Sequence, residues 1–200
     1  MKRLLLFATV AAVCFALLFS VVSFAQDCAD VRRDVLRLHV VAASDSQVDQ
    51  HLKLLVRDAV LERGAEIFDG TVTADEAESI IAPKTDELVK AAQEVLRANG
   101  CDCAVNVTVG EEYFATRCYE EFTMPAGVYT AVRVNIGPAQ GENWWCVMFP
   151  PLCLPSAFAD ADAFFDGDEM RVISASPKYE PRFKIVEVIE SVRSRLNSRN

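Results

Sequence analysis

Apolar and polar residues alternate along several short stretches of the chain, which is the pattern of half-buried β-strands. Over 35–42 every second residue is apolar, whereas Arg37 and His39 share the opposite face. A strand over 144–149 is predicted to be apolar on both faces. Further strands are predicted over 103–109, 112–119 and 128–136.

Helical periodicity with capping signals follows the first predicted strand. Ser46, with Asp49 three residues later, forms a capping-box pattern and predicts a helix that ends at Gly64. Thr73 and Glu76 repeat the pattern and predict a second helical stretch, which runs to Asn99-Gly100.

Pro83 interrupts the second helical stretch, so a kink or two shorter helices are expected there.

Two later segments complete the set of predicted helices. A short helix is expected over 156–165. Near the C-terminus, Ile185, Val188 and Val192 fall on one face of an amphipathic helix.

The order of these elements predicts an α+β fold. The last strands are joined by short turns, which favour antiparallel neighbours. We therefore expect an antiparallel sheet of about four to five strands with two or more helices packed on it, after an N-terminal export segment. The expected domains are a signal peptide or membrane anchor (1–25), a signalling domain (26–155) and a variable C-terminal extension with an amphipathic helix (156–200).

The N-terminus carries the signal for export. Lys2 and Arg3 precede an almost wholly apolar run over 4–22, and Ser23-Phe24-Ala25 resembles a cleavage site. The run approaches the roughly 20 residues that span a bilayer. A cleaved signal and an uncleaved anchor both remain open.

Charge narrows the range of partners. The 200 residues have a formal net charge of -9 and contain no basic stripe, which argues against a nucleic-acid partner. The acidity also argues against docking of the domain on anionic lipid, so membrane contact is expected through the N-terminal segment alone.

The cysteines permit disulfides. Six of the seven lie outside the export segment, and they allow 15 pairings. Cys146 and Cys153 form the favoured pair, because Pro150-Pro151 between them can turn the chain. The alternative is that several cysteines are small buried apolar residues.

Candidate chemistry is sparse. The motifs HExxH, GxxxxGK[ST] and GxSxG are absent. A cysteine nucleophile (Cys146 or Cys118) with His39 as base has no supporting spacing. Zinc binding by Cys101, Cys103 and Cys118 is disfavoured, because Cys101-Asp102-Cys103 is too tight for a zinc pair and a second pair is missing. The acidic residues over 160–168 miss the calcium-loop positions, and no cofactor or metal is expected.

Two stretches carry recognition potential. Trp144 and Trp145 are adjacent, so on a strand they point to opposite faces. Either both faces are covered within the domain or one apolar face meets a partner. Residues 43–50 form a polar stretch that leads into the first helix, and Asp49 is expected to pair with Lys53 on that helix. The stretch is either a structural connection or an exposed recognition loop.

At these stretches the chain resembles the stage II sporulation protein R family. The resemblance covers about residues 35–153, and the run over 143–153 is its most specific part. Ala43, Leu55 and Ala115 depart from the family pattern. The other residues that carry the resemblance lie over 36–60 and at Gly110, Tyr113, Phe114, Thr116, Tyr119, Pro125, Ala126, Gly127, Tyr129, Arg133 and Val134.

The resemblance implies a non-catalytic signalling protein. Members are made in the forespore and exported into the space between the forespore and mother-cell membranes. There they activate a membrane-bound protease, stage II sporulation protein GA, which cleaves the sigma-E precursor. An exported Cys/His-dependent hydrolase of the cell envelope is the alternative. The residues expected to form or support the partner surface are Asp45, Asp49, Arg57, Trp144, Trp145 and Phe149.

Overall fold

The computed structural model divides the chain into two compact units. It describes residues 1–68, 70, 73–119, 122–153, 161, 163–174 and 181–197. Unit 1 comprises Met1–Arg32, Ala115–Gly127 and Gly167–Asn200, and unit 2 comprises Arg33–Phe114 and Val128–Asp166.

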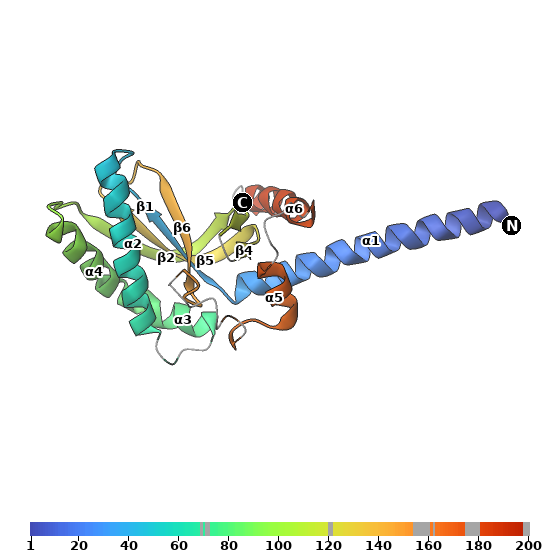
Figure 1. Cartoon of the computed structure of the whole chain (residues 1–200), viewed down its shortest axis with the longest axis horizontal. Helices are drawn as coiled ribbons and strands as arrows, with labels where there is room; N and C mark the ends of the chain where they lie inside the picture. Colours follow the sequence, from blue (N-terminus) through green and yellow to red (C-terminus); the bar gives the residue numbers. More distant parts are fainter. Residues whose placement is uncertain are drawn as a thin grey trace. The chain divides into compact units, whose positions relative to one another are not determined.

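Unit 2 is built on a four-stranded sheet in the order β2-β5-β1-β6 (Figure 1). The strands are β1 (Leu36–Val41), β2 (Val105–Phe114), β5 (Gly127–Ile136) and β6 (Asn143–Phe149). All six residues of β1 are buried, as expected for a central strand. The predicted α+β class is confirmed.

The sheet is mixed rather than antiparallel throughout. β1 pairs in parallel with β5, with Leu38 opposite Val132, and antiparallel with β6, with Leu38 opposite Cys146. The expectation that short turns join neighbouring strands is therefore wrong for β5 and β6, because β1 lies between them. The connection from β1 to β5 contains four helical segments and the strands between them and β5, and such a long connection permits a parallel pair.

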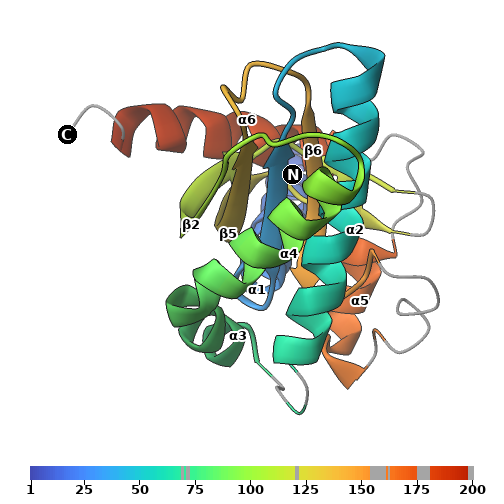
Figure 2. The same cartoon turned by 90° about the vertical axis from the view of Figure 1, so that its left-hand side faces the viewer.

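Helices α2 (Gln47–Ile67), α3 (Ala74–Ile81) and α4 (Thr85–Ala98) belong to the same unit. Figure 2 shows α2 and α4 in front of the sheet. They cover one face, because alternate strand residues share a core with the helix residues. This core includes Leu36, Leu38, Val40, Leu52, Val56, Val60, Leu88, Ala92, Leu96, Val132, Val134 and Met148.

The start of α2 matches the prediction, but its end does not. The Ser46 side chain accepts a hydrogen bond from the Asp49 backbone N at 3.1 Å, which caps the helix. The helix passes through Gly64 and ends at Ile67. Gly64 is buried inside the helix, where a Cβ would overlap the Met148 side chain of β6. This glycine allows close helix–sheet packing instead of ending the helix.

The second helical stretch divides as predicted. The Thr73 side chain caps α3 by accepting from the Glu76 backbone N at 3.2 Å. A short 3-10 helix, η1 (Ala82–Lys84), contains Pro83 and separates α3 from α4. The interruption lets the two helices take different directions over one sheet face.

One predicted strand does not exist as a separate element. Residues 112–119 were expected to form their own strand, but β2 runs without a break through Gly110 to Phe114. The short strand β3 (Arg117–Cys118) follows it and belongs to unit 1. Gly110 weakens a strand without having to end it, and here the edge strand continues through it.

The loops at the ends of β1 and β5 are hydrogen-bonded to each other. The backbone N of Gly141 donates to the Ala42 carbonyl at 3.0 Å, and the N of Ala42 donates to the Glu142 carbonyl at 3.4 Å. A Cβ at Gly141 would overlap the carbonyl of Ser44. Residues 42–45 and 137–142 are thus held together by backbone contacts.

Unit 1 contains the apolar N-terminal helix. Its elements are α1 (Lys2–Arg33), β3, β4 (Thr123–Met124), α5 (Gly167–Ile173) and α6 (Pro181–Asn197). β3 and β4 pair antiparallel. Arg32 Nη1 donates to the Ala126 carbonyl at 3.1 Å, which ties α1 to the segment next to β4. The short helix predicted over 156–165 lies largely outside the described residues.

The length and composition of α1 fit an export segment or anchor. Among the described residues it is the one helix that is long and apolar enough to cross a membrane. None of its most apolar window is buried, so the helix presents an unpartnered apolar surface. The N-terminal segment therefore suggests export or membrane anchoring.

The backbone contact at Gly141 predicts a sensitive position. We expect Gly141→Ala to lower the free energy of unfolding by about 1–3 kcal/mol, because the added methyl group meets rigid backbone at Ser44. Urea denaturation of the full chain in detergent measures the change.

Gly110→Ala is the matched control. Outside its chain neighbours, a Cβ at Gly110 would meet no described atom within 4 Å, so a change within about 1 kcal/mol is expected. Equal effects of the two substitutions would contradict the proposed contact.

Candidate functional site

Two of the residues expected to form or support the partner surface hold the loops together. Asp45 Oδ1 accepts from the backbone N of Glu142 at 2.7 Å. Asp49 Oδ2 accepts from the Ser44 hydroxyl at 2.5 Å. Their carboxylates therefore stabilise the connection between the end of β1 and the start of α2.

A buried lysine completes this loop structure. Lys53 is 4% exposed, and its Nζ donates to the Glu142 carbonyl at 3.2 Å and to the Gln50 side chain. Burial lowers the pKa of Lys53, and the charges of Glu142 and Asp45 oppose that effect. The Asp49–Lys53 helical pair expected from the sequence is replaced by these contacts.

The two tryptophans lie on opposite faces of β6, as strand alternation requires. Trp144 faces the helices, where the guanidinium of Arg57 lies 4.5 Å from its ring centroid. Trp145 stacks on His39, with ring centroids 5.5 Å apart.

Phe149, the sixth expected residue, is a core residue. It is 3% exposed and packs edge-to-face on Phe68 and Phe164. The six expected residues therefore do not form one continuous surface: two hold loops, two lie on the helix side, one lies on the other sheet face and one is in the core.

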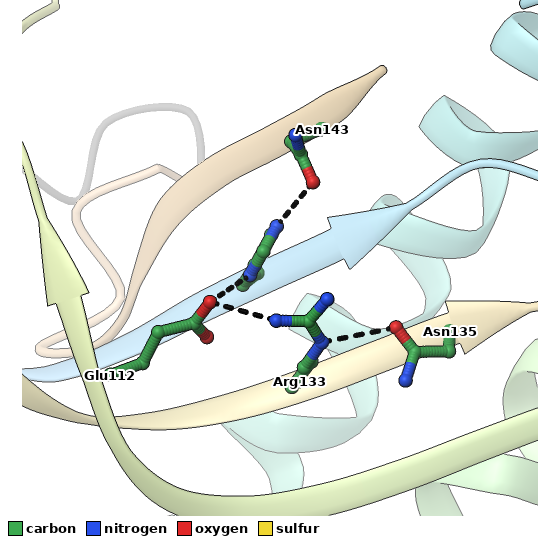
Figure 3. Close-up of polar contacts among 5 residues, drawn as sticks. Glu112, Arg133, Asn135 and Asn143 are labelled. Atoms are coloured by element: carbon green, nitrogen blue, oxygen red, sulfur yellow. Dashed lines mark hydrogen bonds and ion pairs between the residues drawn. The ribbon is translucent and has the colours of Figure 1, made fainter. Parts of the chain in front are cut away.

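A second hydrogen-bonded arrangement in unit 2 lies on the sheet face of Trp145. His39 Nδ1 lies 2.7 Å from Glu112 Oε1, and Arg133 Nη1 donates to the same oxygen at 2.9 Å. Arg133 Nε donates to Asn135 Oδ1 at 3.1 Å, and His39 Nε2 lies 2.7 Å from Asn143 Oδ1 (Figure 3). We call His39, Glu112, Arg133, Asn135, Asn143 and Trp145 the polar cluster.

Each strand of the sheet contributes to the polar cluster. His39 comes from β1, Glu112 from β2, Arg133 from β5 and Asn143 from β6. The register places His39 opposite both Arg133 and Trp145. Alternation then brings their side chains to one face of the sheet.

The polar cluster is buried at its centre and accessible at its edge. The side chains of His39, Glu112 and Arg133 are 5%, 24% and 40% exposed. A hollow of about 190 Å³ lies beside the accessible residues and is lined by Thr108, Val109, Gly110, Glu111, Glu112, Ala131 and Arg133. The charged side chains of Arg133 and Glu112 thus lie at the rim of a small hollow.

The neighbours of Glu112 determine the direction in which the pKa of its carboxyl group is shifted. Burial by itself raises the pKa of this carboxyl group, but the hydrogen bond and charge of His39, followed by Arg133, outweigh burial. The pKa of Glu112 is therefore lower than its ordinary value. The ionised carboxylate is the form that this arrangement stabilises.

Arg37 lies on the same sheet face and is fully buried. Its Nε donates to the Cys146 carbonyl at 2.8 Å. Its guanidinium lies 4.5 Å from the Phe114 ring centroid and 4.9 Å from that of Tyr129. The alternation over 35–42 indicated that Arg37 and His39 share a face, but not that this face is buried at both positions.

The cysteines form two disulfides in unit 2. Cys146 and Cys153 are joined, with Cα atoms 6.3 Å apart, and Cys101 is joined to Cys103. The structure therefore brings together the pair favoured from the sequence. Cys118 is free and exposed.

This arrangement removes the Cys146–His39 hypothesis. The Cys146 sulfur is bonded to Cys153, and Cys146 pairs with Leu38, so its side chain lies on the face opposite to His39. Both ring nitrogens of His39 are also occupied by Glu112 and Asn143. Within the described ranges no group of three or more His, Cys, Asp or Glu side chains is arranged to hold a metal ion.

The fold and the polar cluster define a mixed α+β domain that follows an apolar helix of the export or anchor type. The family model for stage II sporulation protein R matches residues 32–159, which include the whole four-stranded sheet. The chain belongs to the stage II sporulation protein R family, and its role is in sporulation.

A curated relative supports this assignment. Stage II sporulation protein R of Bacillus subtilis (strain 168) is 36% identical over 118 residues, which cover 59% of this chain and 53% of the relative. The chain thus aligns with about half the length of that relative. No solved structure matches the chain.

The lowered pKa of Glu112 predicts a pH-dependent contribution to stability. Glu112→Gln is expected to lower the free energy of unfolding by about 1 kcal/mol at neutral pH, because an anionic acceptor is lost. The contribution of a carboxylate with a lowered pKa disappears as pH falls through that pKa. The difference from wild type should therefore shrink below the ordinary value of 4.5. Urea denaturation over a pH series measures it.

Glu111→Gln provides the control, since Glu111 is the exposed neighbour on the same strand. It should leave stability nearly unchanged at every pH. A Glu112→Gln effect of equal size at neutral pH and at about pH 3 would contradict the role assigned to the ionised carboxylate.

Proposed function

We propose that this protein is an exported forespore signal that activates the membrane-bound sporulation protease, stage II sporulation protein GA. The protease in turn cleaves the sigma-E precursor. Membership of the stage II sporulation protein R family is the observation that carries the proposal, because the match covers the complete sheet domain. The apolar helix α1 supports export into the space between the forespore and mother-cell membranes.

Activation requires a difference in affinity. A protein ligand shifts a protease toward its active state only if it binds that state more tightly than the inactive one. Such a ligand needs a preformed surface with specific polar groups, and no catalytic machinery of its own.

The polar cluster suits this task. Hydrogen bonds fix the Glu112 and Arg133 side chains in place, so little conformational freedom is lost when a partner binds them. Trp145 beside them is an aromatic residue of the kind enriched in binding hot spots. We propose that the protease contacts this surface.

The other residues expected at the partner surface are assigned supporting roles. Asp45 and Asp49 hold the loops that lie next to the start of β6, and Phe149 anchors the end of β6 in the core. Trp144 and Arg57 form a stacked pair on the helix side, which we propose as a second, smaller contact.

The occupied nitrogens of His39 support a non-catalytic role. A general base needs a ring nitrogen within reach of the proton that it removes. Here one nitrogen faces the Glu112 carboxylate and the other faces the Asn143 amide. These contacts position the ring rather than leave it available for proton transfer.

Co-expression tests the proposed function. The protease, the sigma-E precursor and this protein are produced together in a host that lacks sporulation genes, and precursor cleavage is followed by immunoblot. Cleavage is expected only when all three are present. Equal cleavage without this protein would refute the proposal.

The same assay predicts a selective effect at the polar cluster. Arg133→Ala is expected to lower precursor cleavage about tenfold, because truncation of a hot-spot arginine commonly costs this much in affinity. Arg97→Ala is the matched control, since Arg97 lies on α4 and its side chain is 62% exposed. Equal cleavage with both variants would exclude the polar cluster as the contact surface.

A further inference from the structure

Helix α6 has two apolar faces. On its inner face, Phe183 and Val186 are buried within unit 1. On the opposite, outer face, a stripe of large apolar side chains is exposed, with exposed fractions between 41% and 59%. The stripe consists of Ile185, Val188, Ile189, Val192 and Leu196.

The charged residues of α6 are segregated around this stripe. At about 100° per residue, Lys184 and Arg195 fall along one edge of the stripe, and Arg182 and Arg193 fall along the other. The acidic residues, Glu187 and Glu190, lie toward the inner face. Each has a basic neighbour three residues away on the helix: Lys184 lies 2.6 Å from Glu187, and Arg193 lies 3.9 Å from Glu190. The helix thus carries four basic and two acidic side chains in a chain of net charge -9.

The inner face of α6 packs on α1. The Phe24 and Phe183 rings meet edge-to-face with centroids 5.0 Å apart, and the Arg182 guanidinium lies 4.6 Å from the Phe24 ring centroid. Arg32 Nη2 forms an ion pair with Glu190 Oε1 at 3.4 Å. All these contacts involve the last third of α1, after the exposed apolar run over 4–22.

The packing fixes where α6 lies along α1. An apolar run of about 20 residues spans the hydrocarbon core of a bilayer. The run over 4–22 ends two residues before Phe24, so the contacts with α6 begin where α1 leaves the hydrocarbon. A hollow of about 360 Å³ at this level is lined by Phe19, Ser20, Arg171 and Arg182, among other residues.

We propose that α6 lies on the surface of the bilayer that α1 enters, with the outer stripe in the acyl–headgroup boundary. An apolar stripe flanked by exposed Lys and Arg is the arrangement of an interfacial helix, because long basic side chains reach the anionic headgroups. Lys184, Arg193 and Arg195 are exposed and serve this role, whereas Arg182 packs on Phe24. The net charge of -9 argues against lipid contact for the chain as a whole, but α6 reverses that charge locally.

The proposal gives unit 1 a second membrane contact besides the N-terminal segment. The proposed lipid contact is independent of the proposed protease activation, because it is argued from α1 and α6, and α6 lies beyond residues 32–159 that match the family. The ligand is an anionic phospholipid surface rather than a protein.

Photo-crosslinking of the full chain in vesicles tests the position of α6. The probe is p-benzoyl-phenylalanine in place of Val192, and the vesicles contain phosphatidylcholine and phosphatidylglycerol. Irradiation is expected to give a phospholipid adduct on the peptide that contains residue 192. The matched control carries the probe in place of Ser191, which lies off the outer stripe, and should give little adduct. α1 holds both proteins in the vesicle, so the comparison reports on α6 alone.

A charge variant distinguishes binding of α6 to anionic headgroups from mere closeness of α6 to the bilayer. With the probe at position 192, Lys184→Gln combined with Arg195→Gln should lower the adduct yield about tenfold on these vesicles. Both side chains are exposed, and circular dichroism verifies that the helix content is retained. No adduct at position 192, equal yields at positions 191 and 192, an unchanged yield in the charge variant, or a protein adduct with a second copy of the chain would each overturn the proposal.

Discussion

The buried guanidinium of Arg37 connects all four strands of the sheet. It lies on β1, donates to a β6 carbonyl and lies against aromatic rings from β2 and β5. A charge without solvent is costly unless it is paired or hydrogen-bonded, so these neighbours must be in place for β1 to be central. The same register brings His39, two residues further along, against Glu112 and Asn143. The polar cluster is therefore a consequence of how β1 is inserted between β5 and β6.

Local signals in the sequence predicted local structure well. Ser46 and Thr73 cap helices because each hydroxyl needs only a backbone N three residues away. Pro83 divides a helix because its effect is also local. The errors arose where tertiary packing decides. Glycine often ends a helix, but Gly64 lies inside α2, where the helix approaches Met148. The parallel pairing of β1 with β5 depends on a long connection between the two strands, which sequence periodicity does not reveal.

In the candidate site, too, the features set by local sequence were predicted and those set by remote contacts were missed. Alternation alone predicted that Trp144 and Trp145 face opposite directions, and the structure confirms it. Sequence reasoning missed the polar cluster, because His39 and Glu112 are 73 residues apart and meet only through the sheet register. Asp45 looked like a recognition residue for the same reason, since its partner, Glu142, is 97 residues away. A polar side chain on a strand gives no sign of which remote group will satisfy it.

The composition of unit 1 has a consequence for the order of folding. The unit is assembled from three separate segments, and α1, which precedes its other elements in the chain, packs on α6, which follows them. Contacts between such distant segments require a large loss of chain entropy before they form. During synthesis, Phe24 and Arg32 must remain without their α6 partners until α6 itself has emerged. The sheet of unit 2, whose strands end at Phe149, can be completed earlier, so unit 1 closes last.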